Sequence, residues 1–157
     1  MTMLLLSSED LDAIIHQAQE FYPEEVCGFL IGTDCGNDDL LVSRVEASDN
    51  VTSLDRTKHF EIDPELRLRL MVELRELSGK TLSQSNQRSS GQYHSHPNGK
   101  PLPSNRDLSM AWEPDLVWLI LAVSNSKVDE FNAYKLSSHT HKFREVAIDI
   151  RSFANIT

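Results

Sequence analysis

Apolar residues near the N-terminus recur with the period of an amphipathic helix. Four of them share one helical face: Leu11, Ile14, Ile15 and Ala18. Ser7 and Asp10 form a capping-box pattern just before this face, and Pro23 follows it. The pattern predicts a first helix over residues 8–21.

A second helix is predicted after the dipeptide Asp63-Pro64. Aspartate is a favoured N-cap, and proline suits the first helical position. Four leucines then form a single stripe: Leu66, Leu70, Leu74 and Leu77. Gly79 is placed to end this helix. A third, short helix is expected over residues 104–112.

Short apolar runs around these helices predict strands. The expected strands cover residues 26–31, 40–45, 59–62, 93–96, 116–123, 130–136 and 143–150. The run 116–123 is apolar throughout, which is typical of a strand buried on both faces. Strands interspersed with helices indicate a mixed α/β (or α+β) fold, and the 157 residues fit one domain over 1–157.

Two segments are too polar for buried elements. Residues 48–58 are expected to form a loop. Residues 81–90 are dominated by Ser, Gln and Asn, and we expect this stretch to be mobile and disordered without substrate. Because it leads into the strand expected at 93–96, it is also placed to influence substrate choice.

Charge and composition exclude several classes of partner. The formal net charge is −9 and no cluster of Lys and Arg occurs, so neither nucleic acid nor an anionic membrane is expected to bind. The apolar run at residues 3–6 is too short for a signal peptide or a membrane span. We therefore expect a cytoplasmic protein in which Cys27 and Cys35 are reduced thiols.

Candidate chemistry is concentrated in the sequence from His94 to Asp107. In a strand, His94 and His96 point to the same side, about 6.5 Å apart at Cα, so both imidazoles can reach one ion. Catalytic zinc takes three protein ligands, and Asp107 can be the third if the chain turns back after Pro97. Ser104-x-x-Asp107 is equally an ordinary capping box, so a helix start without metal also explains the aspartate.

A second pair with the same spacing, His139 and His141, serves as an internal control. Lys142 and Arg144 crowd it with positive charge, and no helix-start aspartate follows at a comparable distance. We expect this pair to lie in a solvated loop. His16 and His59 are given no role, since neither has suitable partners in the sequence.

In order, Glu25, His94-Ser95-His96-Pro97 and Ser104-x-x-Asp107 resemble the JAMM (MPN-plus) metalloprotease motif. Residues 23–32 resemble the first strand of that family, in which a glutamate stands three residues before a glycine. Residues 60–64, before the leucine-rich helix, resemble its middle segment. The similarity extends over most of the chain, and compact bacterial members, including peptidases acting on ubiquitin-like sulfur-carrier proteins, are the most similar.

This resemblance implies a cytidine-deaminase-like architecture: a central mixed sheet with the first helix and the 63–77 helix packed against it. It implies that a zinc ion is bound by His94, His96 and Asp107. It further implies that Glu25 is the general base and that Ser104 steadies the oxyanion. From the residues alone, Glu24 and Glu25 face opposite sides of a strand and either could be the base; the family spacing selects Glu25.

The implied activity is hydrolysis of a peptide or isopeptide bond, with the C-terminal tail of a ubiquitin-like or sulfur-carrier protein as substrate. The alternative is a non-catalytic MPN-type scaffold that binds a partner protein. A zinc deaminase of similar fold is set aside, because the chain has no C-x-x-C sequence. The sequence indicates no oligomeric state.

Overall fold

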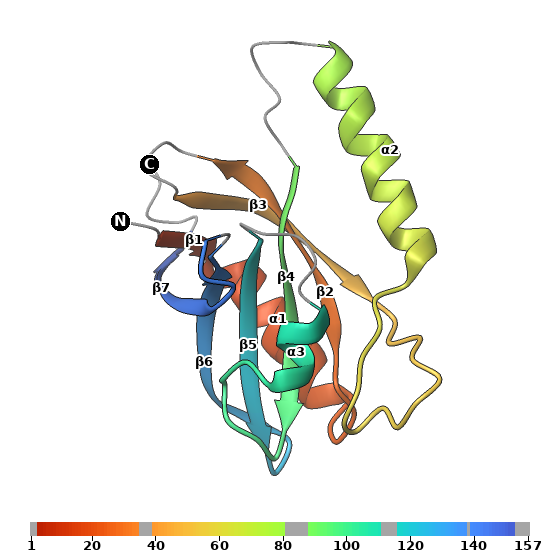
Figure 1. Ribbon diagram of the computed structural model, residues 1–157, viewed down its shortest axis with the longest axis vertical. Coiled ribbons are helices and arrows are strands. Elements are labelled where there is room, and N and C mark those ends of the chain that lie inside the picture. Colours follow the sequence, from red (N-terminus) through yellow and green to blue (C-terminus); the bar gives the residue numbers. More distant parts are fainter. Residues whose placement is uncertain (1–2, 35–38, 81–87, 111–115, 138, 153–157) are drawn as a thin grey trace.

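The computed structural model describes residues 3–34, 39–80, 88–110, 116–137 and 139–152. Its elements in chain order are β1 (Met3–Ser7), α1 (Ser8–Glu20), β2 (Cys27–Asp34), β3 (Leu40–Ser48), α2 (Pro64–Lys80), β4 (Arg88–Pro97), α3 (Asn105–Met110), β5 (Val117–Ser124), β6 (Lys127–Leu136) and β7 (Phe143–Arg151). The helices flank a mixed sheet (Figure 1), so the predicted α/β fold class is confirmed.

The sheet closes on itself in the order β1-β3-β2-β4-β5-β6-β7. Strand β1 completes the ring, because it pairs in parallel with both β3 and β7. Strand β1 was not predicted, because its five residues are too few to show a period. Leu4 and Leu6 are nevertheless buried, so this strand contributes to the core as well as to closure.

Helices α1 and α2 pack on opposite faces of the sheet, as β5 shows. Leu119 and Leu121 join one core cluster with residues of α1, whereas Trp118 and Ile120 join a second cluster with residues of α2. The side chains contributed by the helices are Leu11 and Ile14 from α1 and Leu66, Leu70 and Leu74 from α2. Both predicted helical faces and the doubly buried strand are therefore observed.

Several predicted boundaries differ from the structure, and three of the differences change the picture. Helix α2 continues through Gly79 to Lys80. Residues 59–62 form only an isolated bridge, between Asn50 and Ile62, because a side chain rather than a strand accepts the Glu61 N–H. Strand β4 begins at Arg88, so the expectation of a mobile segment is wrong for residues 88–90, where ladder bonds to β2 need no apolar side chains. Residues 81–87 lie outside the described residues.

None of the helices in the described ranges is both long enough and apolar enough to cross a membrane.

Candidate active site

The three predicted metal ligands meet at one point between β4 and the start of α3. His94 and His96 lie on the same face of β4, and their Nε2 atoms are 2.9 Å apart. Asp107 approaches from the first turn of α3, with Oδ1 3.2 Å from Nε2 of His94 and Oδ2 3.2 Å from Nε2 of His96. A strand period of two residues and a helix start thus bring two imidazoles and a carboxylate together.

The Asp107 carboxylate also belongs to a capping box. The Ser104 N–H donates to Asp107 Oδ2 at 2.8 Å, and the Asp107 N–H donates to Ser104 Oγ at 3.0 Å. The helix-start and metal-site interpretations of Asp107 are therefore compatible, because one carboxylate makes both sets of contacts. The cap fixes the carboxylate in the orientation that faces the two histidines.

The donor set fits a zinc ion. With zinc–nitrogen distances of about 2.0–2.1 Å, tetrahedral geometry places ligand atoms about 3.3 Å apart. The observed separations between Asp107 oxygens and imidazole nitrogens, 3.2 Å, and between the two nitrogens, 2.9 Å, are close to this value. Nitrogen and oxygen donors in this combination are typical of catalytic zinc.

Both imidazoles turn Nε2 toward Asp107, but their surroundings act in opposite directions on their protonation. The His94 ring is fully buried, stacked on Phe60 with centroids 4.5 Å apart and edge-on to Trp118 at 5.6 Å. This burial lowers the pKa of His94 and favours the neutral imidazole. Nδ1 of His96 lies 2.9 Å from the carbonyl oxygen of Lys100. Because a carbonyl only accepts, Nδ1 of His96 carries a proton, and Nε2 is the atom that faces Asp107. Burial opposes protonation of this ring, but its hydrogen bonds to Asp107 and to the Lys100 carbonyl raise the pKa of His96 overall, so a metal ion bound here would have to displace a proton from Nε2.

The carboxylate of Asp107 is ionised at neutral pH. Burial alone would favour the neutral acid, but His94, His96 and the Ser104 N–H hold the pKa of Asp107 well below its usual range. A permanently charged carboxylate beside two imidazoles is the electrostatic environment that a divalent cation requires.

Glu25 approaches the histidines from the residues just before β2. Its ligand atom and those of His94 and His96 all lie within 4.8 Å of one another, so these three residues could also hold a metal ion. Burial raises the pKa of Glu25 to about 7; Asp107 adds to the increase, while His96 and Arg106 oppose it. A carboxyl group with this pKa exchanges protons readily at neutral pH, as a general base must.

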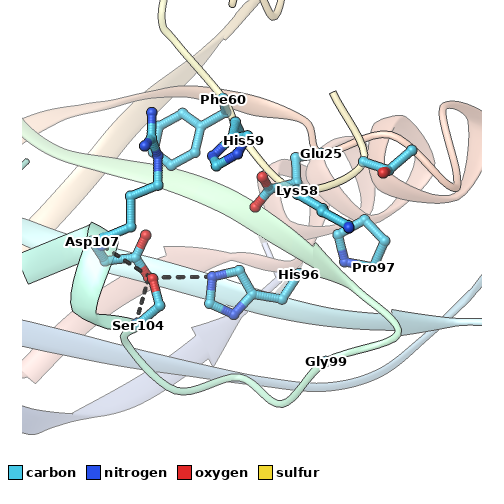
Figure 2. Close-up of a pocket in the computed structure, with 11 residues that line it drawn as sticks. Glu25, Lys58, His59, Phe60, His96, Pro97, Gly99, Ser104 and Asp107 are labelled. Atoms are coloured by element: carbon cyan, nitrogen blue, oxygen red, sulfur yellow. Dashed lines mark hydrogen bonds and ion pairs between the residues drawn. The ribbon is translucent and has the colours of Figure 1, made fainter. Parts of the chain in front are cut away.

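The neighbouring Glu24 faces elsewhere. Its carboxylate is 3.7 Å from the Arg56 guanidinium, in a surface ion pair. Glu25, by contrast, lines a pocket of about 390 Å³ together with His96, Ser104 and Asp107. In Figure 2 Glu25 lies across this pocket from Ser104. Of the two glutamates that the sequence left open as the base, Glu25 is therefore the one that lines this pocket.

The remaining pocket wall comes from the connection between β3 and α2 and from α3. Its side chains are Thr57, Lys58, His59, Phe60 and Arg106 (Figure 2). His59, to which the sequence analysis gave no role, is among them. Nothing in its sequence neighbours signalled this position, because the pocket forms only when the connection folds against β2 and β4.

The glycine three residues after Glu25 is needed for close approach of β2 and β4. A Cβ at Gly28 would collide with the ring of Tyr93 and with the carbonyl oxygen of Glu46. Without that Cβ, the Tyr93 hydroxyl reaches Gln17 of α1 and donates to its Oε1 at 2.6 Å. The family spacing of glutamate and glycine therefore has a packing reason.

Two residues support the site without having been predicted. Ser95, between the two histidines, accepts a hydrogen bond from the Val26 N–H through Oγ at 2.9 Å and donates from its own N–H to the Val26 carbonyl at 3.1 Å. The Tyr134 hydroxyl donates to the Pro101 carbonyl at 2.7 Å and anchors the loop that carries Lys100. Ser95 could have been predicted to support the site, because it is a polar residue between two candidate ligands in a strand. Nothing in the sequence around Tyr134 indicated its role.

The chain is similar to several known proteins. Its residues 7–137 match the family of prokaryotic homologs of the JAB domain (Prok-JAB). A desampylase from Haloferax volcanii is 31% identical over 121 residues, which are 74% of this chain and 78% of that protein.

Solved structures share the fold of this chain. A solution structure from Desulfitobacterium hafniense has a TM-score of 0.75 and 25% identity, and it covers 97% of this chain and 94% of its own. One from Salinibacter ruber has a TM-score of 0.62 and 27% identity, covering 99% and 94%. A crystal structure of a JAB1/MPN domain protein from Archaeoglobus fulgidus shares the fold, with a TM-score of 0.54, 16% identity and coverage of 97% and 100%.

The family match spans well over half of the chain, and the desampylase alignment covers most of both proteins. The resemblance to compact prokaryotic JAMM/MPN proteins that the motif indicated is therefore confirmed. This chain belongs to the family of prokaryotic homologs of the JAB domain.

Proposed function

We propose that this protein is a zinc-dependent metallopeptidase that hydrolyses a peptide or isopeptide bond at the C-terminal tail of a ubiquitin-like protein. His94, His96 and Asp107 are the proposed zinc ligands, Glu25 the general base and Ser104 the oxyanion donor. One observation carries the proposal: two imidazole Nε2 atoms and a carboxylate meet within 3.2 Å of one another, beside a buried glutamate with a pKa of about 7.

The protein residues divide the chemistry between them. A zinc ion in this position would supply Lewis acidity toward water and toward the scissile carbonyl. Glu25 takes a proton from the attacking water and returns it to the leaving nitrogen, for which a pKa near the working pH is best. Ser104 Oγ accepts the Asp107 N–H, so its own hydroxyl proton remains to donate to the developing oxyanion.

The proposed substrate class rests on the relative from Haloferax volcanii. Its name, desampylase, describes an enzyme that acts on a ubiquitin-like modifier, and it shares 31% identity with this chain. A flexible C-terminal tail suits the 390 Å³ pocket, which takes in a few residues of extended chain. A sulfur-carrier protein with such a tail belongs to the same proposed class.

A matched pair of variants tests the proposal. Glu25→Gln and Glu24→Gln make the same chemical change at adjacent residues, one in the pocket and one in an exposed ion pair. Turnover of a ubiquitin-like protein fused through its tail to a reporter, and of an isopeptide-linked conjugate, is measured beside zinc content. We expect Glu25→Gln to keep about one zinc per chain and to lose roughly 10²–10⁴-fold in kcat, and Glu24→Gln to match wild type.

Other results would contradict separate parts of the proposal. Equal losses in the two variants would contradict the role of Glu25. Zinc without cleavage of either substrate would contradict the substrate class. A wild-type protein that neither binds zinc nor cleaves would instead support the MPN-type scaffold.

A further inference from the structure

The connection between β3 and α2 is organised around the side chain of Asn50. Its Nδ2 donates to the Glu25 carbonyl at 3.0 Å and to the His59 carbonyl at 2.9 Å. Its Oδ1 accepts the Thr52 N–H at 3.2 Å and the Glu61 N–H at 3.0 Å. A carboxamide has two N–H donors and two acceptor lone pairs, so this one is fully used.

Glu25 depends on this connection because it lies outside the sheet. The ladders that β2 makes with β3 and β4 begin at Cys27, and Val26 is tied to Ser95. Both backbone groups of Glu25 bond instead to the connection: its N–H donates to the Arg56 carbonyl at 2.7 Å, and its carbonyl accepts from Asn50.

One carboxyl oxygen of Glu25 is not held by a hydrogen bond in the described part of the chain. Its Oε2 is buried without a hydrogen-bond partner among the residues that the structure describes. No hydrogen bond from these residues therefore holds this oxygen in place, and the position of the Glu25 backbone decides from where the side chain enters the pocket. The backbone of Glu25 is in turn imposed by Asn50 and Arg56.

We propose that Asn50 is a positioning residue for the general base: it clamps the Glu25 backbone and, through the His59 carbonyl, joins the pocket wall to it. The inference rests on the proposed function of Glu25. An error of about 1 Å in a reacting group can cost on the order of 10²-fold in rate, so a single side chain that sets the base can matter greatly without contacting substrate.

The most informative variant is Asn50→Asp. It keeps the size of the side chain and the acceptor for Thr52 and Glu61, but replaces the donating NH₂ with an oxygen that faces the carbonyls of Glu25 and His59. Asn50→Ala removes all four bonds. The measurements are kcat and KM on the tail fusion, zinc affinity, the melting temperature, and hydrogen exchange of the Glu25 amide by NMR.

We expect kcat of Asn50→Asp to fall at least about tenfold, with KM and zinc affinity near the wild-type values. The Glu25 amide should exchange at least about tenfold faster, because its bond to Arg56 opens when the clamp is lost. The Ser95 amide, which donates to the Val26 carbonyl within the sheet, should keep its protection.

Two controls separate positioning from general damage. Thr52→Ala removes the hydroxyl that accepts the Leu54 N–H in the same connection, without touching Glu25. Asn125→Asp introduces the same charge in the exposed turn between β5 and β6. Both should leave kcat and the Glu25 amide unchanged, although Thr52→Ala lowers the melting temperature.

The proposal is overturned if Asn50→Asp keeps kcat and Glu25 exchange within about twofold of wild type. It is equally overturned if Thr52→Ala reproduces the loss in kcat at a similar melting temperature. Failure of wild type to cleave any tail fusion would count against the proposed function, whereas Glu25 amide exchange would still decide whether Asn50 clamps the backbone.

Discussion

Two pairs of histidines with identical spacing lie in opposite structural environments in this molecule. His94 and His96 lie in β4, with side chains 0% and 15% exposed and Nε2 atoms 2.9 Å apart. His139 and His141 lie in the exposed turn between β6 and β7, where His141 has a φ of 54° and its N–H donates to the Ser137 carbonyl.

The difference shows that two histidines two residues apart can form a metal site only where the surrounding structure orients and buries their rings. In β4 the strand period turns both rings to one face, Phe60 and Trp118 exclude water from His94, and the Lys100 carbonyl orients the ring of His96. In the part of the chain that the structure describes, the turn between β6 and β7 places none of these constraints on its two rings. Each constraint can be removed by a separate substitution. The loss of zinc binding or activity should be largest for the proposed ligands and smaller for residues that act on them indirectly.

The largest contrast is between His96→Ala and His141→Ala. Removing one of the three proposed ligands should abolish stoichiometric zinc binding and reduce cleavage to background, whereas the same change in the exposed pair should alter neither. Zinc content by atomic absorption and turnover of the tail fusion measure the contrast. Retention of zinc in His96→Ala, or its loss in His141→Ala, would invert the ranking of the two pairs.

Ser104→Ala should leave both histidines in place but slow turnover by roughly 10²–10³-fold, because the proposed oxyanion donor is lost. The capping interaction with the Asp107 N–H is lost as well, so the free energy of unfolding should fall by about 1 kcal/mol. Ser104→Thr keeps the hydroxyl and should restore most of the rate. If threonine fails to rescue while the zinc content stays normal, the hydroxyl has no such role.

Tyr134→Phe tests indirectly whether the Lys100 carbonyl must be held in place to orient the His96 ring. The Tyr134 hydroxyl holds the Pro101 carbonyl, next to the Lys100 carbonyl that faces His96 Nδ1. Zinc affinity, measured by competition with a chelator, should fall about tenfold. Tyr22→Phe removes a hydroxyl that bonds Asn98 in the same loop and should have a smaller effect. An effect of Tyr22→Phe equal to that of Tyr134→Phe would argue for simple loosening of the loop.

The last contrast is one of stability rather than of zinc binding or rate, and it concerns the buried glutamate beside the β4 pair. The folded protein raises the pKa of Glu25 from 4.5 to about 7, so the folded state binds this proton more tightly than the unfolded state. That stabilisation is present at low pH and is lost as pH rises through about 7. Metal-free wild type should thus lose on the order of 2 kcal/mol relative to Glu25→Gln between pH 5 and 8, in urea unfolding. A difference independent of pH would contradict the raised pKa.

Much of the fold could be predicted from the sequence, because helix caps and hydrophobic patterns agree with the tertiary packing. Ser7 caps α1 as predicted, accepting the Asp10 N–H at 3.0 Å. The apolar run in β5 is buried on both faces. Strand β1 and the isolated bridge at Ile62 were not readable, since each is defined by a partner distant in sequence. Backbone pairing of this kind leaves little trace in side-chain periodicity.

The candidate ligands were indicated by a short motif, and the structure brings His94, His96 and Asp107 together. The residues that hold the site were not indicated. Asn50 lies in a polar stretch that predicts only a loop, and its four bonds exist only once Glu25, His59 and Glu61 have converged. The choice of Glu25 over Glu24 likewise needed either the family spacing or the coordinates.

X-ray absorption at the zinc edge of the reconstituted wild-type protein tests the central claim most directly, because it reports both the metal and its ligands. The account predicts about one zinc per chain, coordinated by two imidazoles and further oxygen donors at about 2.0–2.2 Å, with one imidazole lost in His96→Ala. A protein that takes up no zinc after reconstitution, or a zinc ion bound by sulfur, would contradict it.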